Sequence, residues 1–147
     1  QLRMAATDKS IDRVLLEGKG NSFCTGGDLN EFGLLDSTSD AHLIRMVNNP
    51  AFWMSKIHDR ISAHLKGKCM GAGIELPAFC NKVIADETVL ISLPEIKMGL
   101  IPGAGGTVSI PRRIGPQKTA YLALSGQSID SQTALDWKLV NEIIPPL

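Results

Sequence analysis

The fold of this chain is decided by residues 69–80, CMGAGIELPAFC. They follow the alternating run RISAHLK, residues 60–66, whose period of two predicts a strand. Gly71 and Gly73 then let the main chain turn sharply into an apolar helical segment. A strand, a glycine turn and a helix therefore form one structural unit at the centre of the sequence.

Related units flank this one on both sides. RVLLEG, residues 13–18, predicts a buried strand, and the TGGD turn after it places Asp28 where it can cap a helix beginning near Leu29. The other predicted elements are helices over 41–47 and 51–57, strands over 82–86 and 89–93, a helix starting at 107–111, a second helix after Gly115 as far as about Leu124, a helix capped by Asp130 within 128–137, and a closing strand at LVNEII, 139–144. Alternating strands and helices of this length indicate one α/β domain over residues 1–147.

The composition is that of a globular domain with a small-molecule partner. Hydrophobic residues make up 44% of the 147 positions, which is enough for a packed core. Fifteen basic residues balance fifteen acidic ones without a run of like charge, so the sequence carries no signature for nucleic acid or an anionic membrane. No apolar stretch reaches the roughly 18–20 residues of a membrane helix.

The cysteines and histidines predict neither a metal site nor a disulfide framework. They lack CxxC spacing and form no joint ligand pattern, and the three cysteines are odd in number; the residues are Cys24, Cys69, Cys80, His42, His58 and His64. This pattern indicates a reducing compartment. We expect the cytoplasm, and we leave mitochondria and peroxisomes open because a transit peptide would lie upstream of residue 1.

The glycine loops do not match the common nucleotide-binding fingerprints. In the two candidates for G-x-G-x-x-G, Leu76 and Val108 stand where the third glycine is required. Neither a P-loop lysine pattern nor a G-x-S-x-G elbow occurs. The remaining chemistry is that of main-chain amides and carboxylates, and amides at a helix start can stabilise a developing oxyanion. The turn Gly71–Gly73 is the predicted place for such amides.

Three motifs together carry a resemblance to a known family. They are SFCTGGDL (22–29), GAGIEL (71–76) and LPEIKMGLIPGAGG (93–106), the last followed by RRIG (112–115). In order and spacing they resemble the enoyl-CoA hydratase/isomerase or crotonase superfamily, and the similarity continues through LALSG (122–126) and ALDWKLV (134–140). It covers nearly the whole chain.

The resemblance implies a crotonase core of repeated strand–strand–helix turns that binds an acyl-CoA thioester. It implies an oxyanion hole formed by the backbone N–H groups of Thr25 and Ala72, and two catalytic carboxylates, Glu75 and Glu95. Residues around these loops are the expected substrate-binding positions: Cys24, Gly26, Gly27, Asp28, Gly71, Gly73, Pro102 and Gly103. No metal or separate cofactor is implied, since coenzyme A is part of the substrate. Relatives assemble as trimers, sometimes hexamers.

The resemblance further implies hydration of a 2-enoyl-CoA, with a different role for each glutamate. Glu75 is expected in the first turn of its helix, where the helix dipole favours the ionised carboxylate of a general base. Glu95 stands between Pro94 and Ile96, and partial desolvation there is expected to raise its pKa and suit it as the general acid.

Two other functions remain open. A double-bond isomerase would use the same enolate with only Glu95 moving the proton, and a non-catalytic relative would bind acyl-CoA or a protein or RNA partner. The presence of both glutamates favours hydration. Other residues have plainer interpretations: Cys24 as a small buried hydrophobe, His64 as a packing or hydrogen-bonded histidine, and Gly99 and Gly106 as turn glycines.

Two positions depart from the family pattern. Pro77 stands where relatives usually have alanine, and it fits only if the helix begins so late that Pro77 lies in a first turn. Lys138 stands where relatives usually have glycine, so a left-handed residue there would cost about 1 kcal/mol.

The ends of the sequence predict a piece of a longer protein. QLRMAAT, residues 1–7, resembles the end of a helix, and family members have an additional N-terminal strand and helix and further C-terminal helices. If these parts are missing, the faces of RVLLEG and LVNEII should be exposed and the isolated segment should self-associate and hydrate poorly.

Overall fold

Two β-sheets form the centre of the computed structural model, which describes residues 1–31, 37–47 and 49–146. The larger sheet is parallel and has the order β1-β2-β4-β7. In the smaller sheet β3 and β5 are parallel, and β6 is antiparallel to β5. The strands are β1 (Val14–Glu17), β2 (Ile61–Leu65), β3 (Lys68–Met70), β4 (Lys82–Asp86), β5 (Leu90–Ser92), β6 (Ile129–Asp130) and β7 (Glu142–Ile144).

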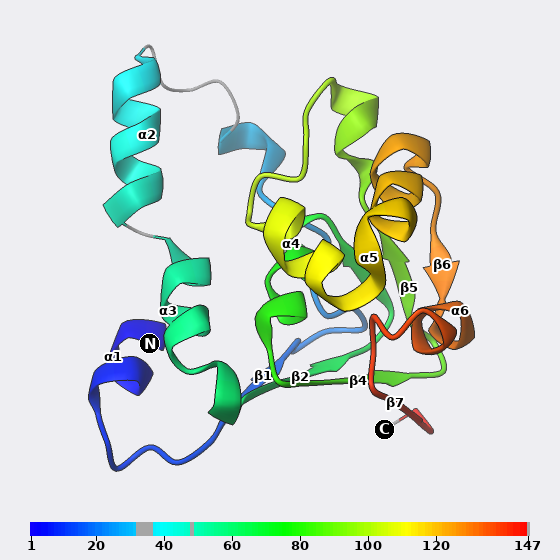
Figure 1. Ribbon diagram of the computed structural model, residues 1–147, viewed down its shortest axis with the longest axis horizontal. Helices are drawn as coiled ribbons and strands as arrows, with labels where there is room; N and C mark the ends of the chain where they lie inside the picture. The colour runs from blue at the N-terminus through cyan, green and yellow to red at the C-terminus, as the bar shows by residue number, and fades with distance from the viewer. Residues whose placement is uncertain (32–36, 48, 147) are drawn as a thin grey trace.

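Helices cover these sheets and fill the turns between them (Figure 1). The α-helices are α1 (Leu2–Thr7), α2 (Thr38–Val47), α3 (Pro50–Lys56), α4 (Ala72–Glu75), α5 (Gly106–Ser125) and α6 (Ser131–Asp136). The 3-10 turns are η1 (Leu29–Glu31), η2 (His58–Arg60), η3 (Pro77–Phe79) and η4 (Pro94–Met98). In Figure 1, α1 and α3 lie together at one end and α2 extends away from the sheets. None of the described helices combines the length and the apolar character needed to cross a membrane.

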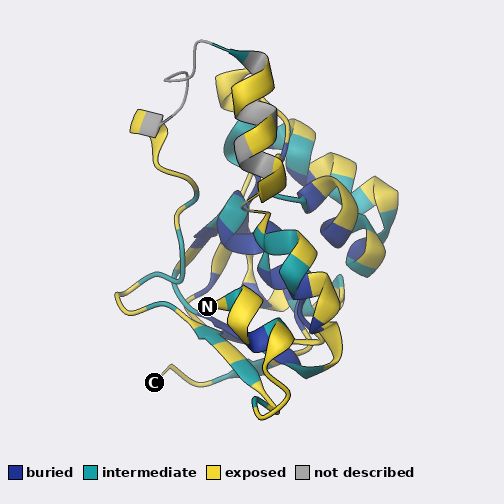
Figure 2. Cartoon of the chain, turned by 90° about the vertical axis from the view of Figure 1, so that its left-hand side faces the viewer, coloured by how far each residue is buried: buried dark blue, intermediate teal, exposed yellow. Residues whose placement is uncertain are grey.

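The repeated strand–strand–helix unit is present in the structure. β2 lies in the large sheet and β3 in the small one, and α4 follows; β4 and β5 repeat this arrangement before η4 and α5. β2 is buried along almost its whole length because strands pair with both of its edges and helices cover the sheet. Buried residues accordingly gather between the sheets and the helices, and exposed ones lie on the outer helix faces (Figure 2).

The predicted strands are confirmed, although the closing one begins at Glu142 instead of Leu139, and some predicted helices are shorter than expected. α4 has four residues because Pro77 cannot continue it, and the chain tightens into η3 with Pro77 as its first residue. The helix expected from Leu29 is a 3-10 turn as far as Glu31, and residues 32–36 lie outside the described residues. β3 was not predicted, because three residues are too few to show an alternating pattern.

The two helices predicted around Gly115 are confirmed as the two segments of α5, which meet at a kink at Gly115. Gly115 has φ 78° and ψ 166°, which lies outside the helical region, and Pro116 follows it. Glycine is the residue that adopts such a conformation at little cost, so the kink belongs there. The predicted cap of the next helix is also confirmed, since the Asp130 side chain accepts a hydrogen bond of 2.8 Å from the Thr133 N–H.

Candidate active site

The candidate site is a cavity of about 1140 Å³ formed where several loops end at the same side of the sheets. The loop after β1, the turns after β3 and β5, and the starts of α3 and α5 contribute to its wall. Nine of the residues expected from the sequence line it: Thr25, Gly26, Gly27, Gly71, Ala72, Glu75, Glu95, Pro102 and Gly103. Cys24, Asp28 and Gly73 are not on this wall, so a direct substrate contact is not expected for them.

Cys24 and Gly73 contact each other next to the wall, and Asp28 fixes a neighbouring turn. Cys24 pairs with Cys69 in a parallel bridge, and the Met70 N–H donates to the Cys24 carbonyl at 3.0 Å. A side chain at Gly73 would collide with the same carbonyl, so a glycine is required where α4 passes the loop. Asp28 accepts hydrogen bonds of 2.9 Å from the main chain and the side chain of Asn30, which fixes the η1 turn.

The bridge brings together the two backbone amides expected to form an oxyanion hole. Thr25 directly follows Cys24, and Ala72 comes three residues after Cys69. Both residues lie on the cavity wall, and neither N–H donates a hydrogen bond to any acceptor in the described part of the chain. Two free donors on one wall are what an oxyanion would need.

Glu75 is held by the start of α5. Its side chain is buried, with 2% of the residue exposed, and its Oε2 accepts hydrogen bonds of 2.8 Å from the Ala104 and Gly106 N–H groups. Glu75 lies in the first turn of α4, as predicted, but the hydrogen-bond donors to its carboxylate come from the loop before α5 and from the first residue of α5. Burial raises the pKa of Glu75, the charge of Glu95 raises it further, and the two N–H groups oppose the rise.

Gly106 is more than a turn glycine, which corrects the sequence interpretation. A Cβ at this position would lie 2.6 Å from the Glu75 Cγ. A glycine is therefore required for the N–H of residue 106 to approach the carboxylate. The sequence signal was the GAGG stretch, but nothing local indicated that it faces Glu75.

Glu95 lies at the start of η4, on the other side of the Gly71 turn. A side chain at Gly71, which has φ +53°, would collide with the Glu95 carboxylate. Burial raises the pKa of Glu95, as its apolar neighbours in the sequence predict. Its Oε2 is buried, and no hydrogen-bond partner for it exists among the described residues.

The two glutamates therefore differ in what they can do chemically. Glu75 has two N–H donors that stabilise a negative charge, whereas the buried Glu95 Oε2 has none among the described residues. When one proton is shared between two neighbouring carboxyl groups, the ionised form belongs where donors exist. The geometry fits a base at Glu75 and an acid at Glu95.

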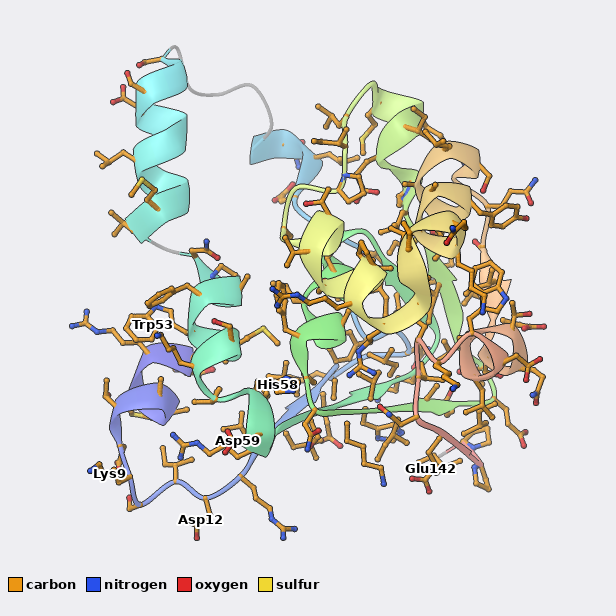
Figure 3. The ribbon with its side chains drawn as sticks, viewed as in Figure 1. Lys9, Asp12, Trp53, His58, Asp59 and Glu142 are labelled. Carbon is orange, nitrogen blue, oxygen red and sulfur yellow. The ribbon has the colours of Figure 1, made fainter. Side chains whose placement is uncertain are left out.

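Apart from Lys97, which lines the cavity, the other titratable residues considered in the sequence lie away from it. His64 is buried and its Nδ1 lies 3.6 Å from Glu17 Oε1 on the neighbouring strand, and burial raises the pKa of Cys69 and of Cys80 to about 12. His58 points from η2 toward η3, where its ring hydrogen-bonds to the Phe79 carbonyl at 2.7 Å (Figure 3). Among the residues that the structure describes, no group of three histidine, cysteine or acidic side chains is placed to hold a metal ion.

A family model agrees with this geometry. The model described as enoyl-CoA hydratase/isomerase matches residues 1–146. The chain belongs to this family. Solved structures of the family also confirm the crotonase-type α/β fold: an enoyl-CoA hydratase from Bacillus anthracis has a TM-score of 0.86 at 30% identity, over 98% of this chain and 56% of that chain.

Two curated relatives show how much of a family member this chain represents. The 2,3-dehydroadipyl-CoA hydratase of Escherichia coli is 35% identical in an alignment of 147 positions that covers 99% of this chain and 56% of the relative. The fatty acid oxidation complex subunit alpha of Shewanella amazonensis is 30% identical in an alignment of 148 positions that covers 98% of this chain and 21% of the relative. The chain thus spans little more than half of one relative and a small part of the other.

Proposed function

We propose that the protein carrying this sequence is an enoyl-CoA hydratase that adds water to a 2-enoyl-CoA to give a 3-hydroxyacyl-CoA. One observation carries the proposal: the buried Glu75 carboxylate, the half-buried Glu95 carboxylate and two backbone N–H groups without an acceptor among the described residues share one cavity wall. A hydratase needs a base for water, an acid for carbon, and donors for the thioester oxygen. The names of the relatives, a dehydroadipyl-CoA hydratase and a fatty acid oxidation subunit, favour the same reaction.

Each group has one role in the proposed reaction. The Thr25 and Ala72 N–H groups bind the thioester oxygen and stabilise the enolate. Glu75 takes a proton from water as the oxygen forms its bond to C3, and Glu95 gives a proton to C2. Glu75 must start ionised and Glu95 protonated. The two N–H donors to Glu75 and the buried Glu95 Oε2, which has no partner among the described residues, favour this order.

We also propose that the reaction needs no separate cofactor, because coenzyme A enters as part of the substrate. The apolar residues at the cavity mouth suit an acyl chain; they are Leu29, Met98, Leu100 and Ile101. A homotrimer or hexamer in the cytoplasm is the proposed form of the whole protein, by analogy with the family.

Replacing each glutamate by glutamine tests the proposal. Glu75→Gln and Glu95→Gln should each lower kcat for crotonyl-CoA at least about a hundredfold, since each removes a general acid or base, while the KM changes little. The loss of conjugated thioester absorbance measures the rate. Glu87→Gln, on the exposed turn between β4 and β5, is the matched control and should keep full activity.

The same variants separate the alternatives. If Glu75→Gln keeps full turnover while Glu95→Gln is inactive on an isomerase substrate, the protein is an isomerase. If the unmodified protein binds acyl-CoA without converting either substrate, it is a non-catalytic binding member of the family.

A further inference from the structure

The main-chain carbonyl of Glu75 has lost its usual hydrogen-bond donor. In a continuing α-helix this oxygen would accept from the N–H of Phe79, four residues later. Pro77 prevents the continuation, and in the η3 turn the Phe79 N–H donates to the Leu76 carbonyl at 2.9 Å instead. Across the described ranges, no main-chain N–H donates to the Glu75 carbonyl.

Ser109 supplies the missing donor. Its Oγ donates to the Glu75 carbonyl at 2.7 Å, and both residues are buried, with 1% of Ser109 and 2% of Glu75 exposed. A buried carbonyl without a partner is costly, so this single hydroxyl satisfies a group that Pro77 leaves open.

Ser109 belongs to the same turn that holds the Glu75 carboxylate. The Ala104 and Gly106 N–H groups hold the carboxylate at the start of α5, and the Ser109 N–H donates to the Gly105 carbonyl at 2.9 Å within that turn. The loop before α5 and the first turn of α5 therefore bind Glu75 at its carboxylate and at its main-chain carbonyl. A shift of the Glu75 main chain relative to these N–H donors would break the Ser109 hydrogen bond.

We propose that Ser109 is a positioning residue for Glu75, and that Pro77 makes it necessary. Ser109 lines a separate cavity of about 500 Å³ together with residues of η3, and not the cavity proposed for the substrate, so it acts through Glu75. The inference rests on the proposed function in that Glu75 is taken as the base.

Ser109→Ala in the protein carrying this sequence should lower kcat for crotonyl-CoA about tenfold with a KM changed less than about twofold, because a misplaced base slows the chemical step. Ser109→Thr keeps the hydroxyl and should restore most of the activity. Thr119→Val is the matched control, because it removes another hydroxyl-to-carbonyl bond of 2.7 Å on α5 that does not involve Glu75. It should keep the unmodified kcat.

The dependence on Pro77 gives a second test. Pro77→Ala lets the helix continue, so the Phe79 N–H can return to the Glu75 carbonyl. In the Pro77→Ala background, Ser109→Ala should lower kcat by less than about twofold. The proposal is overturned if Ser109→Ala lowers kcat equally with and without Pro77→Ala, or if Ser109→Ala is as active as the unmodified protein.

A titration separates this proposal from the proposed function. The Ser109→Ala change weakens the hydrogen bonds from the N–H groups that lower the Glu75 pKa. The Glu75 pKa should therefore rise. The acid limb of the pH–kcat profile should move to higher pH with it. Carboxyl-carbon NMR, with Glu75→Gln for assignment, measures the same pKa without substrate. If the unmodified protein is inactive, the hydratase proposal is refuted and the positioning role of Ser109 is not. If the Glu75 pKa is unchanged in Ser109→Ala, the positioning role is refuted and the hydratase proposal is not.

Discussion

Glu95 has a raised pKa, and its buried Oε2 has no hydrogen-bond partner among the described residues. Ionisation of Glu95 therefore lowers the free energy of unfolding by an amount that depends on pH. Its ordinary pKa is 4.5, and the folded state binds its proton more tightly than the unfolded state. Below about pH 4.5 Glu95 is protonated in both states, so it does not lower the free energy of unfolding there. As the pH rises through the raised pKa of the folded state, ionisation costs stability.

We therefore predict that Glu95→Gln is more stable than the unmodified protein at neutral pH, although it is inactive. The difference in Tm should be smallest near pH 4 and should grow toward pH 8, because glutamine never ionises. Thermal unfolding at several pH values measures it, with Glu87→Gln as the control for the loss of one negative charge at an exposed position. A difference that stays constant with pH would contradict the burial of an ionisable group at Glu95.

Gly71 sets the position of Glu95 by leaving room for its carboxylate. Gly71→Ala should lower kcat at least about tenfold, because the new methyl group collides with Glu95 and pushes the acid away from the substrate. The backbone at Gly71, with φ +53° and ψ −120°, is one that a residue with a Cβ rarely adopts, which adds a stability cost of about 1–3 kcal/mol. Gly99→Ala is the matched control: it has φ +67° and no neighbour within 4 Å of the added methyl group. Equal losses of kcat in both variants would show that strain alone is responsible.

At the scale of elements, the end of α6 shows how a departure from the family pattern is accommodated. Lys138 has φ 67°, and its N–H donates to the Leu135 carbonyl at 2.8 Å while the Leu139 N–H donates to the Ala134 carbonyl at 2.8 Å. These two bonds define a Schellman motif, in which glycine is the preferred left-handed residue. Leu139 is fully buried, and burial of this side chain helps to keep the motif in place despite the lysine.

Lys138→Gly should raise the free energy of unfolding by up to about 1 kcal/mol, since it removes the strain of a left-handed side chain. Lys138→Ala keeps that strain and should leave stability near that of the unmodified protein. Urea unfolding of the three proteins gives the comparison. A glycine variant no more stable than the alanine variant would mean that the strain at residue 138 is negligible.

At the scale of the whole molecule, exposed apolar residues gather around the cavity mouth. Leu29 is 64% exposed and Ile101 is 75% exposed, and both line the cavity. The expectation that the closing LVNEII segment would be exposed is wrong at its start, because Leu139 and Val140 are buried under α6 and the sheet. Leu15 on β1 is exposed, as expected for RVLLEG.

We predict that the 147-residue polypeptide expressed alone self-associates through this mouth, because large exposed apolar patches favour association. Ile101→Gln should shift sedimentation velocity profiles toward the monomer. Leu124→Gln is the control, because Leu124 is 71% exposed but does not line the cavity, and it should leave the profile unchanged. A polypeptide that sediments as a monomer at all concentrations would contradict the prediction.

Much of the fold was determined by the sequence alone, because its signals act over a few residues. The alternation of 60–66, the glycine turn at 71–73, the Asp130 cap and the left-handed Lys138 all depend on near neighbours. The pairing of Glu75 with Ala104 and Gly106, 29 and 31 residues away, was decided only by the tertiary structure. So was the Ser109 bond across 34 residues. Contacts between such distant residues leave no periodic trace in the chain, and they form only when the sheets bring α4 and α5 together.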